Sequence, residues 1–528
     1  MKLPKDWERH SLRDFIEKLE SGVSVNAEDI PVSNGSPAVL KVGCVSGGVF
    51  YPQENKRILE SEIHRAKLTV RKGTVIISRS NTQELVGECA YIKQDYPNLY
   101  LSDKTWQTIF KPGAQVDARW LGYLLSSPGV KQKLGNLSNG TSGSMKNISK
   151  ESFLSLEVIT PPPKEQSAIA DFLDVLDRNI EQTKKLIAAQ IQFKRSLMQQ
   201  MLTGKKRFKE FEGLEWESMK ISDFAKLTLR ATLKPDKPFK SLGIRSHGKG
   251  TFLKEDFEPE KIELTELYEV KGNDLIVNIT FAWEGAIAIA GAQDLGALVS
   301  HRFPTYVFDT ERAIPEYFRH VIIQKWFVEK LGLISPGGAG RNRVLSKKDF
   351  AKLEVLTPPL EEQRRIAAVL NACDKESTLL KQQLDALKRQ KRGLMQKLLT
   401  GQIRLLQRFS VVCDLRRVST ASGSERGSIN GPNEEATLAT ARGTDPAQPL
   451  IANESHAFEN RCKFRRKPSA PLAIANWPLA IVSQEVWRSF LPDNCQWPMP
   501  ELNVIGFQAV LVSHANHPKS ELQAASRR

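Results

Sequence analysis

Two stretches of this chain are near-copies of each other, and they decide the fold. Residues 157–204 read EVITPPPKEQSAIADFLDVLDRNIEQTKKLIAAQIQFKRSLMQQMLTG, and residues 354–401 read EVLTPPLEEQRRIAAVLNACDKESTLLKQQLDALKRQKRGLMQKLLTG. They align without a gap at an offset of 197 residues and are identical at 21 of 48 positions. A repeat of this kind indicates a chain built from two related halves.

Each copy has the features of one long helix. Thr160-Pro161-Pro162 and Thr357-Pro358-Pro359 mark its start, because proline is tolerated in a first helical turn and disfavours helix before it. Gly204 and Gly401 suit the position just past a helix end. Apolar residues between these signals recur at alternating steps of four and three, which is heptad spacing. A helix of about 40 residues measures about 60 Å.

The heptad spacing predicts one apolar seam on each helix. Two seams in one chain most simply bury each other, and a two-fold repeat makes the helices antiparallel. The alternative is that each helix packs only on its own domain. The residues expected to pack the helices or to dock partners are Ile169, Leu173, Leu176, Ile180, Ile187, Leu197, Ile366, Leu370, Leu380, Leu384, Leu387 and Leu394.

The regions between the helices predict two domains of mixed α/β (α+β) structure. Each begins with a Trp-Glu pair, at Trp7 and at Trp216, and each contains β-rich runs such as 68–78 and 274–279. The resulting segments are a first domain (1–160), a first helix (161–204), a second domain (205–357), a second helix (358–404) and an extension (405–528). The extension holds no copy of the repeat, and its Ser/Thr/Gly/Pro/Asn-rich part predicts a largely irregular, partly disordered tail.

Composition bounds the function. The chain has 528 residues, too many for one core, and 76 Lys and Arg against 60 Asp and Glu give a net charge of +16. Such a surplus favours a polyanion such as nucleic acid, although solubility charge is the alternative. We find neither a membrane-length apolar run nor a secretory leader, and the six cysteines form no CxxC pair, so we expect a cytoplasmic protein without a structural metal.

The sequence offers no catalytic motif. Residues 243–249 begin like a phosphate-binding loop, but Gly250 stands where the loop needs a magnesium-binding Ser or Thr. Zinc-protease, serine-hydrolase and EF-hand patterns do not occur, and no methyl-donor loop follows a strand. We therefore expect a binding protein that has no catalytic residue and no metal ligand of its own.

Candidate DNA contacts lie in both domains. Arg pairs with guanine, Asn pairs with adenine, and Lys suits phosphate. Trp106 and Trp283 are either core residues or stacking platforms. The basic residues at the helix ends face either DNA, a partner or solvent. The candidates for DNA binding are Arg79, Ser80, Asn81, Lys104, Asn278, Arg302, Arg341 and Arg343.

The doubled pattern resembles the specificity subunits of type I restriction-modification enzymes. The matching motifs are residues 160–170 with 197–204 and residues 357–367 with 394–401, and the resemblance covers about residues 1–404. It implies two target recognition domains separated by two antiparallel conserved spacer helices. Each domain then reads one half of a bipartite, asymmetric double-stranded DNA site, and the helices set the unread spacer.

The resemblance also implies partners. Two modification (methyltransferase) subunits dock on the helices and bring S-adenosylmethionine, and restriction subunits bring ATP, Mg²⁺, translocation and cleavage. The specificity subunit itself carries no cofactor and does not bind a membrane. Two alternatives stay open: a stand-alone duplicated DNA-binding regulator, which needs no partner for tight binding, and a coiled-coil scaffold.

Overall fold

The computed structural model describes residues 4–33, 35–139, 145–337 and 343–405. Most of the extension predicted at 405–528, and with it its expected irregularity, lies outside the described residues. Within the described part, no helix combines the length and the apolar character that a membrane span requires.

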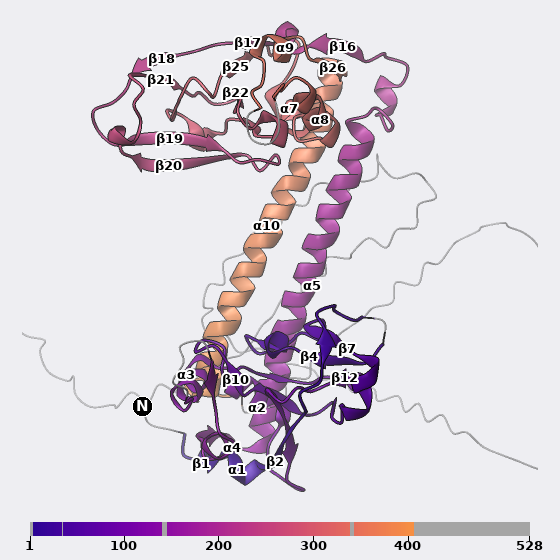
Figure 1. Cartoon of the computed structure of the whole chain (residues 1–528), viewed down its shortest axis with the longest axis vertical. Helices are drawn as coiled ribbons and strands as arrows, with labels where there is room; N and C mark the ends of the chain where they lie inside the picture. Colours follow the sequence, from indigo (N-terminus) through magenta and orange to yellow (C-terminus); the bar gives the residue numbers. More distant parts are fainter. Residues whose placement is uncertain (1–3, 34, 140–144, 338–342, 406–528) are drawn as a thin grey trace, which may run out of the picture. The chain divides into compact units, whose positions relative to one another are not determined.

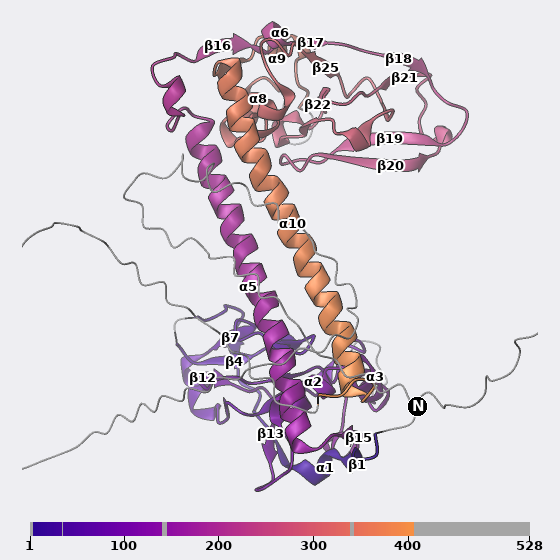
Figure 2. The same ribbon diagram turned by 180° about the vertical axis from the view of Figure 1, so that it is seen from behind.

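Two long helices contact each other along their length. They are α5 (Pro163–Met201) and α10 (Leu360–Leu399), of 39 and 40 residues. Figures 1 and 2 show them side by side and running in opposite directions. Proline precedes each helix, and Gly204 and Gly401 follow with positive φ angles of 69° and 71°, a conformation that favours glycine. The antiparallel arrangement predicted from the repeat is confirmed.

The first domain contains two main sheets. A four-stranded sheet has the order β11-β9-β13-β2, and a five-stranded sheet has the order β3-β7-β4-β12-β8. Strands β1 and β15 pair antiparallel, as do β10 and β14, and β5 and β6. The elements are β1 (Glu8–Ser11), α1 (Leu12–Phe15), β2 (Ile16–Ser21), β3 (Ala27–Glu28), β4 (Ala38–Leu40), β5 (Val45–Ser46), β6 (Val49–Phe50), β7 (Asn55–Ile58), β8 (Thr69–Val70), β9 (Val75–Ser78), β10 (Ser80–Asn81), β11 (Cys89–Tyr91), β12 (Tyr96–Tyr100), β13 (Thr105–Phe110), α2 (Ala118–Leu125), α3 (Pro128–Asn136), β14 (Lys146–Asn147), α4 (Lys150–Leu154) and β15 (Glu157–Thr160), with 3-10 helices at Val42–Cys44 and Glu60–Arg65.

The second domain repeats this plan. Its four-stranded sheet has the order β17-β25-β22-β23, its five-stranded sheet has the order β18-β21-β24-β19-β20, and β16 pairs with β26. The elements are β16 (Glu217–Lys220), α6 (Ile221–Phe224), β17 (Ala225–Leu227), β18 (Ala231–Leu233), β19 (Phe239–Ile244), β20 (Thr251–Phe257), β21 (Glu266–Glu269), β22 (Leu275–Val277), β23 (Ile287–Ile289), β24 (Leu298–Val299), β25 (Thr305–Phe308), α7 (Pro315–Val321), α8 (Lys325–Leu333), α9 (Lys347–Ala351) and β26 (Glu354–Thr357), with 3-10 helices at Lys209–Phe211, Pro259–Lys261, Ala282–Glu284 and Ala292–Asp294.

Apolar strands form the centre of each domain. In β9 all four residues of the run Val-Ile-Ile-Ser are buried, and in β22 all three residues of Leu-Ile-Val are buried. Continuous apolar runs of this kind suit strands that are covered on both faces.

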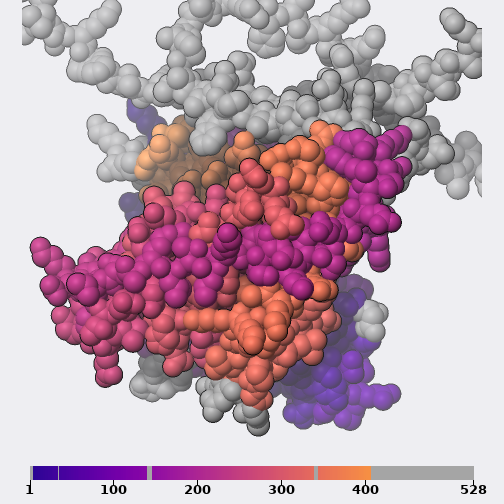
Figure 3. All heavy atoms as spheres, turned by 90° about the horizontal axis from the view of Figure 1, so that it is seen from above, coloured from indigo at the N-terminus to yellow at the C-terminus, as the bar shows by residue number. Residues whose placement is uncertain are grey.

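In Figure 3, which views the second domain from above, its magenta and salmon atoms adjoin the orange atoms that lead into α10.

The core of the first domain also contains residues from the far end of the chain. Leu398 and Leu399 at the end of α10, together with Leu405, pack into the cluster that includes Leu12 and Trp120. Leu405 is only 5% exposed. The repeat alone placed Leu405 in the extension, but the structure places it in the core.

A buried glutamine anchors each domain to the start of its own helix. Gln166 accepts a hydrogen bond from the backbone N–H of Asp117 (2.8 Å) and donates to the carbonyl of Pro161 (2.9 Å). Gln363 does the same with the N–H of Ile314 (3.1 Å) and the carbonyl of Pro358 (3.0 Å). Both side chains satisfy backbone groups that are otherwise costly to bury.

We expect Leu173→Ala to destabilise the first domain by about 3 kcal/mol, since it removes a fully buried side chain and leaves a cavity. The exposed Leu379→Ala on α10 is the matched control and should change stability by less than about 0.5 kcal/mol. Thermal unfolding measures both. Equal effects of the two changes would contradict the burial of Leu173.

Candidate functional site

Four polar pairs join the two helical halves in one register. They are Glu165–Arg404, Asp177–Lys391, Lys194–Asp374 and Arg207–Glu362. The two residue numbers add up to 568 or 569 in every pair, as a single antiparallel register requires. Adding the 197-residue offset to Glu165 and Arg207 gives Glu362 and Arg404, and adding it to Asp177 and Lys194 gives Asp374 and Lys391. The repeat therefore relates the two outer pairs to each other and the two inner pairs to each other. The pseudo-two-fold symmetry predicted from the sequence is therefore present in the side-chain contacts.

The first end cluster lies where α5 begins and α10 has just ended. Arg404 donates two hydrogen bonds of 2.7 Å to the carboxylate of Glu165, which is 4% exposed. Trp7 Nε1 donates to the same carboxylate at 3.2 Å, and the backbone N–H of Leu405 does so at 3.3 Å. Arg404 also binds Asp6, and these hydrogen bonds to Glu165 and Asp6 raise the pKa of its guanidinium.

The second end cluster has the same Glu, Arg and Trp. Arg207 donates to both oxygens of Glu362 at 2.9 and 2.6 Å, and Trp216 Nε1 donates to that carboxylate at 3.1 Å. The Glu362 side chain is completely buried. In both clusters the Arg guanidinium lies 5.8 Å from the Trp ring centre. A buried carboxylate needs a partner of this kind, because an unpaired buried charge is strongly destabilising.

The sequence carried a signal for these clusters that helix-start reasoning did not use. The repeat continues past the glycines to Arg207 and Arg404, and the Trp-Glu openers contribute Trp7 and Trp216. An acidic residue in a first helical turn is ordinarily explained by the helix dipole, which favours negative charge there. In the structure each glutamate is also the acceptor of an Arg that follows the other helix.

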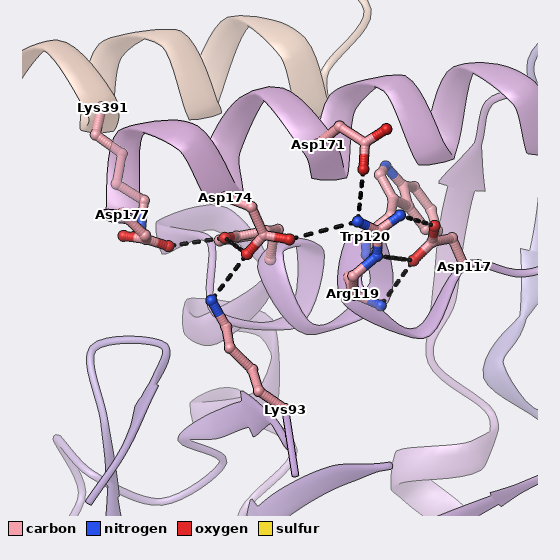
Figure 4. A network of polar contacts seen from close by, with 9 residues as sticks. Lys93, Asp117, Arg119, Trp120, Asp171, Asp174, Asp177 and Lys391 are labelled. Atoms are coloured by element: carbon pink, nitrogen blue, oxygen red, sulfur yellow. Dashed lines mark hydrogen bonds and ion pairs between the residues drawn. The ribbon is translucent and has the colours of Figure 1, made fainter. Parts of the chain in front are cut away.

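A polar network joins the first domain to both helices (Figure 4). Asp177 on α5 accepts from Lys391 on α10 at 2.5 Å and from the Tyr123 hydroxyl at 2.7 Å. Tyr123 also donates to Asp174 at 3.0 Å, and the ammonium of Lys391 lies 5.1 Å from the tyrosine ring centre. Burial, followed by the charges of Asp177 and Asp174, raises the pKa of Tyr123. Arg119 on α2 completes the network through Asp174 and two further aspartates.

The corresponding place in the second domain is less charged. His320 takes the position of Tyr123, and Asn371 takes that of Asp174, each at the 197-residue offset. His320 Nε2 and Asn371 Oδ1 are 2.9 Å apart, and Lys194 binds Asp374 at 2.5 Å. Burial, followed by the charge of nearby Lys194, lowers the pKa of His320 to about 4. Both halves therefore have an ion pair between the helices, but the domain side chain next to it is Tyr123 in the first half and His320 in the second.

The predicted helix-packing residues fall into two groups. Those near the helix ends are buried, and they are Ile169, Leu173, Leu176, Ile180, Leu197, Ile366 and Leu370. Those toward the middle of the pair and the end of α10 are only partly buried, and they are Ile187, Leu380, Leu384, Leu387 and Leu394. The helices therefore pack most tightly beside the domains. A docking role for these residues stays a prediction.

The candidate DNA contacts of the first domain lie in the short strand β10 and in the loops near it. Ser80 and Asn81 form this strand and are 3% and 8% exposed, and Asn81 donates a hydrogen bond to Ser78 Oγ at 3.3 Å, so both are structural residues. Arg79 is half-buried, and its Nε donates to the carbonyl of Asp103 at 2.7 Å. Trp106 is 1% exposed and is a core residue.

The second domain places its candidates in the same way. Asn278 is 9% exposed and accepts from the Thr280 N–H at 3.1 Å, whereas Arg302 is exposed. Arg343 donates to two backbone carbonyls, and its guanidinium lies 5.4 Å from the ring centre of the half-buried Trp283. The remaining candidate, Arg341, lies outside the described residues.

Equivalent backbone bonds relate the two sets of loops. The Arg79 N–H donates to the carbonyl of Lys104 at 3.0 Å, and the Ile279 N–H donates to the carbonyl of Arg302 at 3.0 Å. Lys104 and Arg302 are thus cations at matching positions. Within the part of the chain that the structure describes, neither they nor Arg79 and Arg343 form an ion pair with a carboxylate. The same part of the chain contains no cluster of three or more His, Cys, Asp or Glu residues that could hold a metal ion.

One family model matches most of the chain in two copies. It is described as the type I restriction modification DNA specificity domain, and it matches residues 4–191 and 213–389. Each matched stretch includes one domain and most of the long helix that follows it.

Similar proteins are specificity subunits of type I restriction enzymes. The MjaX specificity subunit of Methanocaldococcus jannaschii is 23% identical over 430 residues, which cover 76% of this chain and 95% of that protein. The MjaVIII specificity subunit of the same organism is 22% identical over 433 residues, which cover 77% and 95%. The crystal structure of a type I restriction-modification S subunit from M. genitalium covers 75% of this chain and 98% of its own, with 14% identity and a TM-score of 0.48.

Arg404→Met should destabilise the first domain by about 3 kcal/mol, because it leaves the Glu165 carboxylate buried without its cation. The double variant Glu165→Gln/Arg404→Met should recover part of that loss, since no unpaired charge remains. Thermal unfolding is the measurement, with the exposed Arg392→Met as control. An unchanged midpoint in Arg404→Met would contradict the role of the end cluster.

The lowered pKa of His320 predicts a pH effect. Between pH 6.5 and 4 the unfolded chain binds a proton at this position that the folded chain does not, so stability should fall as pH falls. His320→Gln keeps a hydrogen-bonding group beside Asn371 and removes the titration. Its loss of stability at pH 4 should be smaller by about 3 kcal/mol. Denaturation between pH 7 and 4 tests this, and identical profiles for both proteins would refute it; the exposed His64→Gln is the control.

Proposed function

The chain belongs to the family of type I restriction modification DNA specificity proteins, and we propose that it gives such a complex its DNA sequence specificity. The observation that carries this proposal is the double match of the specificity domain. The relatives that align over most of this chain are named as specificity subunits.

Each domain reads one half of a bipartite, asymmetric DNA site. The two domains share a plan but differ in sequence, so the two half-sites differ as well. A rigid frame between two readers fixes the distance between half-sites, as it does in dimeric DNA-binding proteins. The helix pair, about 60 Å long, exceeds one DNA turn of about 34–36 Å, and it acts as the ruler for the unread spacer.

Cations on the loops after the central strands face the DNA. Arg302 and Lys104 occupy equivalent positions, and neither is neutralised by a carboxylate within the described residues. Arg79 and Arg343 hold backbone carbonyls with part of the guanidinium and keep other N–H groups for phosphate or base edges. The buried Ser80, Asn81 and Asn278 support these loops.

The remaining functions belong to other subunits. Two modification subunits dock on the helix pair, one for each half, and supply S-adenosylmethionine. Restriction subunits supply ATP and Mg²⁺ chemistry. This chain recognises the site and is not itself the catalyst, and the complex acts in the cytoplasm, where the DNA is. The stand-alone regulator is the weaker explanation, because the relatives over most of the chain are named as restriction enzyme subunits.

The decisive test is methylome sequencing of cells that express this chain with its candidate modification subunit. We expect one new methylated motif in two parts with a fixed gap. Replacing residues 51–147 with those of another family member should change only one half-site. Replacing the counterpart at the 197-residue offset, residues 248–344, should change only the other.

Three outcomes would count against the proposal. A change in both half-sites after either exchange would remove the two-reader arrangement. A soluble complex that methylates no new motif would refute the assigned specificity. Tight, site-specific binding by the chain alone, with no complex formed, would favour the regulator.

A further inference from the structure

Charged residues interrupt the apolar seam of the helix pair at two related positions. Lys194 on α5 and Lys391 on α10 occupy heptad positions where apolar residues are usual. Their side chains are each only 17% exposed, and they bind Asp374 and Asp177 at 2.5 Å. We call these two ion pairs the cross-helix pairs.

The apolar seam between the cross-helix pairs selects a register only weakly. Ile180 in this stretch is buried, but its other apolar residues Ile187, Leu380, Leu384 and Leu387 are only partly buried. A heptad seam also repeats every seven residues, so helices displaced by one heptad again bring apolar residues together. A displacement of that size moves one helix by about 10 Å along the other. The apolar contacts of this middle stretch by themselves therefore leave neighbouring registers close in free energy.

We propose that the cross-helix pairs act as the register selector of the helix pair, and that they thereby set the distance between the two domains. A polar or charged group at a single seam position is known to specify register in coiled coils, at some cost in stability. The link from register to DNA spacing rests on the proposed function. The register itself is a property of this chain alone.

The residues one heptad away from each partner explain the selection. A slip in one direction replaces Asp374 with Lys381 opposite Lys194, so two lysines meet. The same slip replaces Asp177 with Lys184 opposite Lys391, so two more lysines meet. Both ion pairs then become repulsive contacts in a place where water is partly excluded.

The slip in the other direction is also unfavourable. It places Ala367 opposite Lys194 and Ala170 opposite Lys391, and both alanines are buried. Each lysine then loses its carboxylate and faces an apolar surface, which is costly for a charge that is already largely removed from water. Only the observed register pairs all four charges.

The cross-helix pairs are also tied to the domains. Asp177 accepts a hydrogen bond from the hydroxyl of Tyr123 on α2, and the Lys391 ammonium lies over the Tyr123 ring. These contacts attach α2 of the first domain to both long helices beside the Asp177–Lys391 pair (Figure 4). His320 on α7 lies beside Lys194 and bonds to Asn371. A change of register would therefore move each domain against the helix that belongs to the other half. The end clusters hold the same register from just beyond the helix ends, through Arg207 and Arg404, and the cross-helix pairs hold it within the helices.

Disulfide cross-linking in the full chain reads the register without DNA. Ile187→Cys with Leu380→Cys reports the observed register, because the residue numbers add up to 567, close to the sum for the ion pairs. Ile187→Cys with Leu387→Cys reports a slip of one heptad, and the native Cys373 reports the opposite slip. Mass spectrometry of digested protein identifies which cysteines are joined.

In the wild-type background we expect only the cross-link of the observed register. Lys194→Met/Lys391→Met should raise the slipped cross-links at least about tenfold. The milder Asp177→Asn/Asp374→Asn should act in the same direction. The matched control is Arg195→Met/Arg392→Met, the exposed neighbours of the two lysines, which should leave the cross-links unchanged.

Charge exchange tests whether the pairing itself matters. Lys194→Asp/Asp374→Lys with Lys391→Asp/Asp177→Lys keeps both pairs and should restore the observed cross-link. Unchanged cross-links in both charge-removing variants would overturn the register selector.

The methylome then tests the link to spacing. A slip of about 10 Å corresponds to about three base pairs, so the Lys→Met variant should methylate sites whose gap differs by about three. Slipped cross-links with an unchanged gap would overturn that link while the register selector stands. Absence of a bipartite motif even in the wild type would count against the proposed function and not against the register selector.

Discussion

The reciprocal pairing of a buried glutamate with an arginine from the other half is the interaction on which the rest of the structure depends. Glu165 and Glu362 each begin one long helix, and each is neutralised only because the other helix has just ended beside it. Parallel helices could not satisfy both carboxylates, because both arginines would then lie at the far end. Burial of two charges thus makes the antiparallel arrangement a condition for folding rather than one option among several.

The first domain depends on both halves of the chain. The first domain includes Leu398, Leu399 and Leu405 in its core, so it is complete only when the end of α10 has arrived. Contacts at this separation along the chain carry a large loop-closure entropy, which burial of apolar area must offset. The first domain is consequently not a simple appendage of its own helix, because its core is completed by the helix of the other half.

The two copies share the residues that hold the helix pair together, and they differ in the residues of the domains. The end clusters, the anchoring glutamines and the cross-helix pairs are retained at one offset of 197 residues, because each member is needed by a partner in the other copy. Tyr123 and His320 lie beneath the same ion pair yet differ in chemistry, since either ring fills the space and bonds to a helix residue. The loops that carry Lys104 and Arg302 keep the same backbone bond while the side chains around them diverge. We therefore expect two domains that share one fold but differ in their surface side chains.

The sequence alone determined the repeat, the two long helices and the mixed composition of the domains, because heptad spacing and proline and glycine signals are local and the repeat is visible in the letters. The antiparallel direction was a prediction from the two-fold repeat, and the buried Glu–Arg pairs of the structure give its physical reason. The family resemblance also depended only on these motifs. The tertiary structure decided which polar residues are buried, since Glu165 reads as an ordinary first-turn acid until Arg404 is brought to it. It also decided that Ser80, Asn81 and Asn278 support loops, and that Leu405 belongs to the core. The physical reason is that burial and charge pairing depend on residues hundreds of positions apart, whereas helix and turn signals are contained in a few neighbouring residues.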